Sequence, residues 1–192
     1  MNLIPRVKNI LLQPGLEWDL IEREQTTVGD LYSSYILPLA AIGPVASVIG
    51  LSLIGINLPA SGMYRVPLGS AIGHAALSYV LGLAGVYVLA LVIDALASSF
   101  QGSKNHIQAM KVAAYSSTAA WLASIFIVIP VLGFLQIVGL YSLYLLYLGL
   151  PPLMKAPREK ALLYTVVVVI AALVVFAVIG ALGSLFISNP AP

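Results

Sequence analysis

Asp94 is the residue of this sequence whose position most directly suggests chemistry. It is the one ionisable carboxylate within the long apolar stretches of the chain, and a lone carboxylate is costly to bury in hydrocarbon. Two interpretations stay open. Asp94 lies at a membrane interface, hydrated or paired with Lys104 or Lys111, and has a structural role. Alternatively, it lines a polar cavity as an ion or proton site.

A second set of candidate residues carries hydroxyl and indole groups. It consists of two clusters, Tyr115, Ser116, Thr118 and Trp121 in the first and Tyr141, Tyr144 and Tyr147 in the second. Folding the chain back about Val131 brings the two clusters to the same depth. The facing pairs are then Tyr115 with Tyr147, Thr118 with Tyr144, and Trp121 with Tyr141. Such pairs predict interhelical hydrogen bonds that lock a hairpin, each contributing about 0.6–2 kcal/mol. A substrate path lined by the tyrosines is the alternative.

Other chemistry finds little support in the residue types. The chain has no cysteine, so it offers no thiolate metal site and no thiol nucleophile. His74 and His106 fall at opposite ends of the expected bundle and cannot share a metal ion. The sequence has neither an HExxH nor a GxSxG motif. We therefore expect a protein that is not an enzyme and uses no cofactor or metal.

The stretch from Val112 to Met154 determines the fold class. It contains no charged residue and no histidine, and as one helix it would be about 65 Å long, twice the thickness of a bilayer core of about 30 Å. It must fold back, and Pro130 with Gly133 marks the turn. The whole chain is 60% hydrophobic and 8% charged, whereas soluble proteins carry about 25% charged residues. This composition indicates an integral membrane protein.

The remaining apolar stretches complete an all-α membrane protein with five transmembrane helices. The expected spans are approximately 35–56, 70–97, 112–129, 131–151 and 162–187, with a loop between the first two at 57–68. Pro38, Gly43 and Pro44 are expected to interrupt the first span, because each proline removes a backbone hydrogen bond. We expect a membrane domain over 31–192, preceded by a cytoplasmic or interfacial segment over 1–30.

The segment 1–30 predicts two short helices outside the bilayer core. The first has an apolar face with two cations nearby, formed by Leu3, Val7, Ile10 and Leu11 with Arg6 and Lys8. Such an amphipathic helix is suited to rest on a membrane surface with its apolar face in the lipid. Pro14 and Gly15 end it. A second short helix over 16–24 is expected to pack partly on the membrane domain.

The distribution of cations predicts the orientation. Of nine lysines and arginines, Arg65 alone falls on one side of a five-span topology. The other side receives Arg6, Lys8, Arg23, Lys104, Lys111, Lys155, Arg158 and Lys160. Because cytoplasmic loops are rich in lysine and arginine, the N-terminus is expected in the cytoplasm and the C-terminus outside. A net charge of +2 gives no reason to expect nucleic acid as a partner.

Several motifs resemble the Yip1-domain membrane proteins, particularly their bacterial branch. They are KVAAYSSTAAW at 111–121, IPVLG at 129–133 and GLYSLYLLYLGL at 139–150, with the residues Pro130, Gly133, Gly139 and Gly149. Asp30 and Tyr32 resemble the Asp-Leu-Tyr-Gly-Pro signature of eukaryotic members, although Ser33 and Ser34 replace its Gly-Pro. The resemblance implies a five-helix domain with a cytoplasmic N-terminus in a bacterial inner membrane.

The resemblance also bears on function. Eukaryotic members are associated with Rab-type GTPases, vesicle traffic and membrane shaping, and much of that partner binding is ascribed to cytoplasmic regions. This chain has only about 30 such residues, so GTPase binding is not carried over. We expect a membrane-organising or protein-interaction module whose partners are the lipid bilayer and either a second copy or another membrane protein. A small transporter or channel around Asp94 is the alternative.

Overall fold

Long apolar helices dominate the computed structural model, which describes residues 2–58 and 62–187. Within these residues, helices long and apolar enough to cross a membrane number five, as the sequence predicts: Val28–Ile54, Leu68–Phe100, His106–Val128, Pro130–Met154 and Arg158–Val178. The fifth belongs to a helix, α10, that continues as Arg158–Ile187. The all-α class and the five spans are therefore confirmed, while several boundaries differ from the expected ones.

The first span begins earlier than expected because Thr27 caps it. The Thr27 hydroxyl accepts a hydrogen bond from the Asp30 amide at 3.1 Å, and the Asp30 carboxylate accepts one from the Thr27 amide at 3.2 Å. This capping box starts a helix at Val28. The span is then divided as the prolines predict, into α3 (Val28–Leu31), a π-helical turn (Tyr32–Ile36), α4 (Leu37–Ala40), α5 (Ile42–Val48) and a second π-helical turn (Ile49–Ile54).

The connection after the first span contains two short strands in place of an irregular loop. The strand β1 (Ile56–Leu58) pairs antiparallel with β2 (Gly62–Tyr64). Gly55 precedes β1 with a φ of 87°, a backbone conformation that glycine adopts without steric cost. The hairpin leads into α6 (Leu68–Leu96).

The predicted membrane hairpin is present, and its turn is very tight. The third span consists of α7 (His106–Ser116), α8 (Thr118–Ala123) and a 3-10 helix (Ser124–Val128), and the fourth consists of a 3-10 helix (Pro130–Leu140) and α9 (Tyr141–Met154). Only Ile129 between them is extended, with φ −112° and ψ 100°. At Gly139 a Cβ would lie 3.2 Å from Ala120 Cα, so the two spans approach closely.

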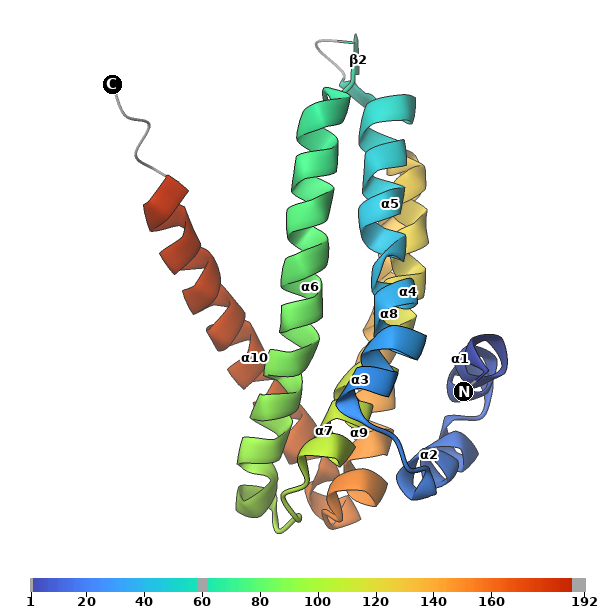
Figure 1. Cartoon of the computed structure of the whole chain (residues 1–192), viewed down its shortest axis with the longest axis vertical. Coiled ribbons are helices and arrows are strands. Elements are labelled where there is room, and N and C mark those ends of the chain that lie inside the picture. Colours follow the sequence, from blue (N-terminus) through green and yellow to red (C-terminus); the bar gives the residue numbers. More distant parts are fainter. Residues whose placement is uncertain (1, 59–61, 188–192) are drawn as a thin grey trace.

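Figure 1 shows how the spans and the N-terminal helices are arranged. The helices α5 and α6 run side by side toward the β-hairpin, the tip of the membrane hairpin lies behind α5, and α10 diverges from them. At the other end, α1 (Leu3–Leu12) and α2 (Pro14–Arg23) lie beside the bundle. The largest fully buried side chains gather at this end of the bundle and include Trp18, Tyr35, Tyr115, Tyr164 and Lys111.

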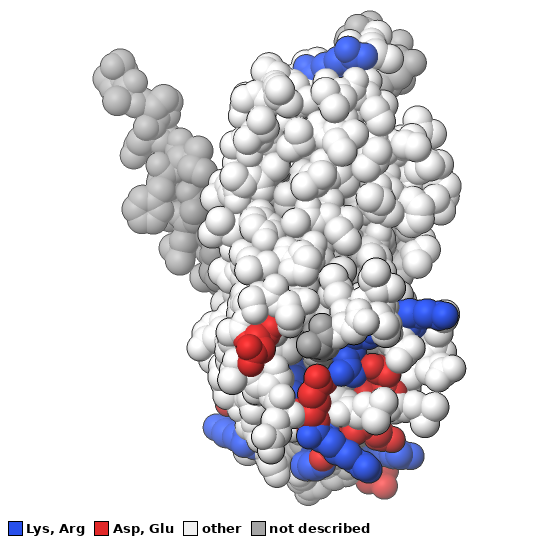
Figure 2. Space-filling model, turned by 45° about the vertical axis from the view of Figure 1, so that its right-hand side comes forward, with Lys and Arg blue, Asp and Glu red and all other residues white. Residues whose placement is uncertain are grey.

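Charged side chains are concentrated at the end of the molecule that carries α1 and α2. Figure 2 shows lysine, arginine and acidic residues clustered there, with a long uncharged surface above them. A further group of basic atoms, coloured blue, lies at the opposite end of the molecule, near the β-hairpin. Arg65 directly follows β2 in the chain. The separation of charges that the sequence predicts is therefore present. Which end faces the cytoplasm stays a prediction.

Candidate functional site

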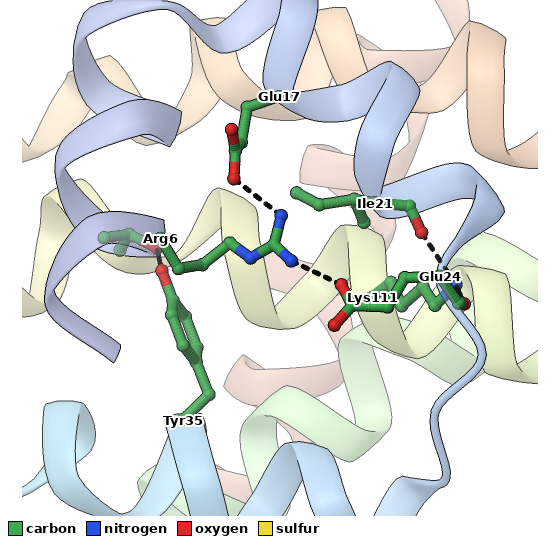
Figure 3. A network of polar contacts seen from close by, with 7 residues as sticks. Arg6, Glu17, Ile21, Glu24, Tyr35 and Lys111 are labelled. Atoms are coloured by element: carbon green, nitrogen blue, oxygen red, sulfur yellow. Dashed lines mark hydrogen bonds and ion pairs between the residues drawn. The ribbon is translucent and has the colours of Figure 1, made fainter. Parts of the chain in front are cut away.

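The N-terminal helices are held against the bundle by a cluster of buried polar contacts. Arg6 of α1 binds the carboxylates of Glu17 at 2.6 Å and Glu24 at 2.5 Å, and its guanidinium lies 5.6 Å from the centre of the Tyr115 ring. Figure 3 shows Arg6 between the two carboxylates. Glu17 is buried, and a buried carboxylate requires a partner. Arg6 thus joins α1 to α2 and places both over the third span.

Lys111 belongs to the same cluster of buried polar contacts. Its Nζ donates hydrogen bonds to the backbone oxygens of Ile21 at 2.8 Å and Glu24 at 2.6 Å. These carbonyls lie at the C-terminal end of α2, where helical carbonyls lack donors and a positive charge is favoured. Lys111 is only 2% exposed. The predicted pairing of Lys111 with Asp94 is therefore wrong, because Lys111 caps α2.

Two further contacts attach α2 to the membrane domain. Lys155, which follows α9, pairs with the Glu22 carboxylate, and the Gln108 side chain donates to the Glu22 backbone oxygen at 3.0 Å. Hydrogen bonding to Lys155 lowers the pKa of Glu22 below its ordinary value of 4.5. Side chains of the third span and of the residue after the fourth span thus contribute to one docking site for α2.

The apolar face of α1 points toward the bundle and not toward lipid. Ile10 is fully buried, and the neighbouring apolar residues of that face, Leu3, Val7 and Leu11, pack against the core. The expectation that this face rests in the membrane is therefore wrong, because it is covered by protein. The exposed large apolar side chains of α1 and α2 are instead Ile4, Leu12, Leu16 and Leu20.

The first hydroxyl cluster pairs with the first span. Thr118 Oγ1 lies 2.7 Å from Tyr35 OH and donates to the Tyr115 backbone oxygen at 2.7 Å. Since the Thr118 proton is used on Tyr115, Tyr35 is the donor to Thr118. The predicted Thr118–Tyr144 pair is wrong, because the partner of Thr118 is Tyr35 of the first span. Trp121 also faces Tyr35, with ring centres 6.5 Å apart, and the buried Ser116 hydroxyl donates to the Ala113 oxygen.

The tyrosines of the second cluster do not pair with the first cluster as predicted. Tyr141 OH donates to the Leu11 backbone oxygen at 3.0 Å, which ties α9 to α1. Tyr144 and Tyr147 are 47% and 36% exposed and line a groove between α9 and α10. The polar link across the hairpin is made by Ser142, whose hydroxyl accepts from the Ala120 amide at 2.9 Å. Nothing in the spacing of the tyrosines distinguished Ser142 from its neighbours.

Asp94 has no ion pair among residues 2–58 and 62–187. Its Oδ1 is buried without a hydrogen-bond partner in this part of the chain, and Lys104 is exposed. The predicted pairing with Lys104 is therefore not formed. Next to Asp94, Tyr164 of α10 donates to the Ile93 backbone oxygen at 2.5 Å and stacks on Phe100, with ring centres 4.7 Å apart.

The residues that resemble the family signature lie at the starts of helices and at contacts between helices. Asp30 completes the cap of the first span, and Tyr32 OH donates to the Leu83 oxygen of α6 at 2.8 Å. Pro130 begins the fourth span, and Gly133 lies in its first turns. Gly139 permits the close approach of the hairpin helices described above. A Cβ at Gly149 would lie 2.7 Å from the Trp18 ring, so this glycine admits the indole of α2.

These features define a polytopic helical membrane protein whose N-terminal helices are docked on the bundle. The chain belongs to the Yip1 domain family, whose model matches residues 8–179. It is similar to the inner membrane protein YohC of Escherichia coli strain K12, with 28% identity over 163 residues, covering 83% of this chain and 84% of YohC. YohC of E. coli strain O6:H1 is similar to the same extent. No solved structure matches. The chain is an integral membrane protein of the inner membrane.

Proposed function

We propose that this chain is a non-catalytic membrane-organising module that holds a helical platform, α1 with α2, in one leaflet of the inner membrane. The observation that carries the proposal is the outer surface of the platform. Its exposed fractions are 76% at Ile4, 69% at Leu12, 67% at Leu16 and 60% at Leu20. Large apolar side chains exposed together mark a surface that contacts lipid or protein.

The position and attachment of the platform support lipid as the contact. The platform lies at the charged end of the bundle (Figure 2), where the membrane interface is expected. Interfacial helices bury their apolar side about 5–10 Å into the headgroup boundary. Arg6 joins α1 to α2 and Lys111 fixes α2 to the bundle, so the platform enters the leaflet as a rigid body. A rigid body in one leaflet displaces headgroups on that side and favours a curved membrane.

The orientation and the division of the chain form part of this proposal. We place the platform, within residues 1–30, at the cytoplasmic leaflet, and assign 31–192 to the membrane domain. Besides the bilayer, a second copy of the chain or another membrane protein is the expected class of partner. Such a partner would meet the spans, since their outer surfaces are apolar.

Spin labels in reconstituted vesicles test the contact between platform and lipid. Labels at Leu12 and Leu16 should be broadened by a lipid-soluble relaxation agent, while a label at the exposed Asn9 should respond to a water-soluble one. Vesicle shape then tests the consequence. Wild type should narrow the vesicles, and Leu12→Glu with Leu16→Glu should reduce the effect, whereas Lys8→Gln should not. Equal vesicle radii with and without protein would reject the proposal.

Transport is a second candidate because of Asp94. A buried carboxylate oxygen without a partner among the described residues is the kind of group that marks an ion pathway in a membrane protein. If Asp94 serves transport, cation or proton flux into proteoliposomes should exceed that of empty vesicles and be lost in Asp94→Asn. Equal flux in both proteins would exclude this role.

A further inference from the structure

A cavity of about 540 Å³ lies where α2, the end of α9 and the start of α10 meet. Its wall includes the Trp18 ring, Pro151 of α9 and Ala161 of α10. Cavities of roughly 300–1,000 Å³ commonly bind small ligands. This one lies at the charged end of the bundle, where the lipid headgroups are expected.

An apolar groove of about 440 Å³ adjoins the cavity and runs between α9 and α10. Tyr147 lines both hollows. The groove is otherwise lined mainly by aliphatic side chains of the two spans, including Leu143, Leu162, Val166 and Ile170. Because these side chains lie within membrane-spanning helices, the molecules that surround the groove are lipids, and an acyl chain matches its shape and polarity.

The cavity carries one charge of each sign. Arg158 and Asp19 both line it, and both are exposed. Neither takes part in an ion pair with the residues that the structure describes. A guanidinium binds phosphate through two parallel hydrogen bonds. A carboxylate on the same cavity would repel a purely anionic headgroup but bind an ammonium group.

Two backbone oxygens of residues that line the cavity lack the helical donor four residues later. In a helix, the carbonyls of Tyr147 and Leu148 normally accept from the amides four residues later. Those positions are Pro151 and Pro152, which lie inside α9 and have no N–H. Tyr147, Leu148 and both prolines line the cavity. Carbonyl acceptors of residues that line the same cavity as Asp19 suit a primary ammonium, which has three donors.

We propose that the cavity and the groove together bind one phospholipid with an ethanolamine headgroup. Arg158 binds its phosphate, Asp19 and the carbonyls of α9 bind its ammonium, and the groove between α9 and α10 holds an acyl chain. This inference goes beyond the proposed function, because the site can select a lipid whether or not the platform curves the membrane.

Native mass spectrometry of the full chain tests the proposal. The protein is offered equal amounts of phosphatidylethanolamine, phosphatidylglycerol and phosphatidylcholine with the same acyl chains, and the retained lipids are counted. We expect the ethanolamine lipid to be retained in preference to the other two. Equal retention of all three headgroups, or preference for phosphatidylglycerol or phosphatidylcholine, would overturn the proposal.

Charge variants assign the headgroup contacts. Arg158→Gln should lower retention of the ethanolamine lipid about tenfold, since a charged hydrogen bond is lost. Arg23→Gln removes another exposed cation and should retain the lipid as the wild type does. Asp19→Asn should lose the preference for the ethanolamine lipid over phosphatidylglycerol. If Arg158→Gln and Arg23→Gln retain lipid equally, the headgroup site is not at this cavity.

A pair of tryptophan variants tests the groove. Val166→Trp fills the groove and should lower retention of lipids of every headgroup. Leu163→Trp adds the same bulk on an exposed part of α10 outside the residues that line it and should leave retention unchanged. Equal retention by the two variants would contradict an acyl chain in the groove. Because lipid retention is measured on the isolated protein, this result is independent of vesicle shape.

Discussion

Gly149 of α9 lies directly against the indole of Trp18 of α2. A Cβ at position 149 would stand 2.7 Å from Cζ2 and 2.8 Å from Cε2 of the ring, distances at which one of the two helices must move. Trp18 itself is 1% exposed. The absence of a side chain at one position of the fourth span therefore allows the second N-terminal helix to dock.

Gly149→Ala is expected to destabilise the protein by about 1–3 kcal/mol, the usual cost of overpacking a close contact. Denaturant unfolding in micelles measures the change. Gly73→Ala is the matched control, because a Cβ there meets nothing within 4 Å, and its effect should stay within about 0.5 kcal/mol. Equal effects of the two variants would show that the Trp18 contact is not restrictive.

Lys111→Met should loosen α2 selectively. It removes the Nζ donor from the backbone oxygens of Ile21 and Glu24. The Ile21 oxygen keeps the Glu24 amide at 3.3 Å, so the main cost is the unsatisfied Glu24 oxygen, about 1–3 kcal/mol. Hydrogen exchange should therefore accelerate in α2 and less in α6. Lys104→Met alters an exposed lysine and should leave exchange unchanged. Similar exchange in both variants would contradict the role of Lys111 as a cap.

Tyr35→Phe should lower stability by about 0.5–1.5 kcal/mol, the net value of one hydrogen bond. Combined with Thr118→Val, the loss should be smaller than the sum of the single losses, because the two hydroxyls are partners. Tyr144→Phe serves as the control and should have little effect. Additive losses for the first pair would mean that the Tyr35–Thr118 contact contributes nothing of its own.

Docking of α2 should weaken in acid. The pKa of Glu22 is lowered in the folded protein, chiefly by its hydrogen bond to Lys155, so its contribution is present above the ordinary value of 4.5 and is lost over the acid interval below it, as pH falls through the folded value. Fluorescence of Trp18 in a Trp121→Phe background reports this docking. Glu22→Gln should flatten the pH dependence over that interval. An unchanged curve would assign the acid effect to other carboxylates.

The orientation is tested by reporter fusions. Since eight of the nine lysines and arginines fall on one side of a five-span chain, a reporter inserted near Lys104 should be cytoplasmic. A reporter after Pro192, a position outside the described residues, should be periplasmic. A cytoplasmic reporter at both positions would require an even number of spans.

The sequence was sufficient for the spans and the hairpin, because length, charge and proline position determine them. It was insufficient for side-chain partners. Counting from Pro130 gives the depth of Thr118 but not the direction in which it points around its helix, and Tyr35 of a different span proved to be its partner. Likewise, Arg6 and Lys111 could be assigned to a side of the membrane by their charge. Their acceptors on α2 depend on packing between segments far apart in the chain.

The contacts of α2 also impose an order on folding during synthesis. Glu17 and Glu24 can bind Arg6 as soon as the first residues leave the ribosome. The carbonyls of Ile21 and Glu24, however, receive Lys111 only after the third span is made, and Trp18 finds Gly149 only after the fourth. The N-terminal helices are therefore translated first but can dock fully only after the fourth span is made.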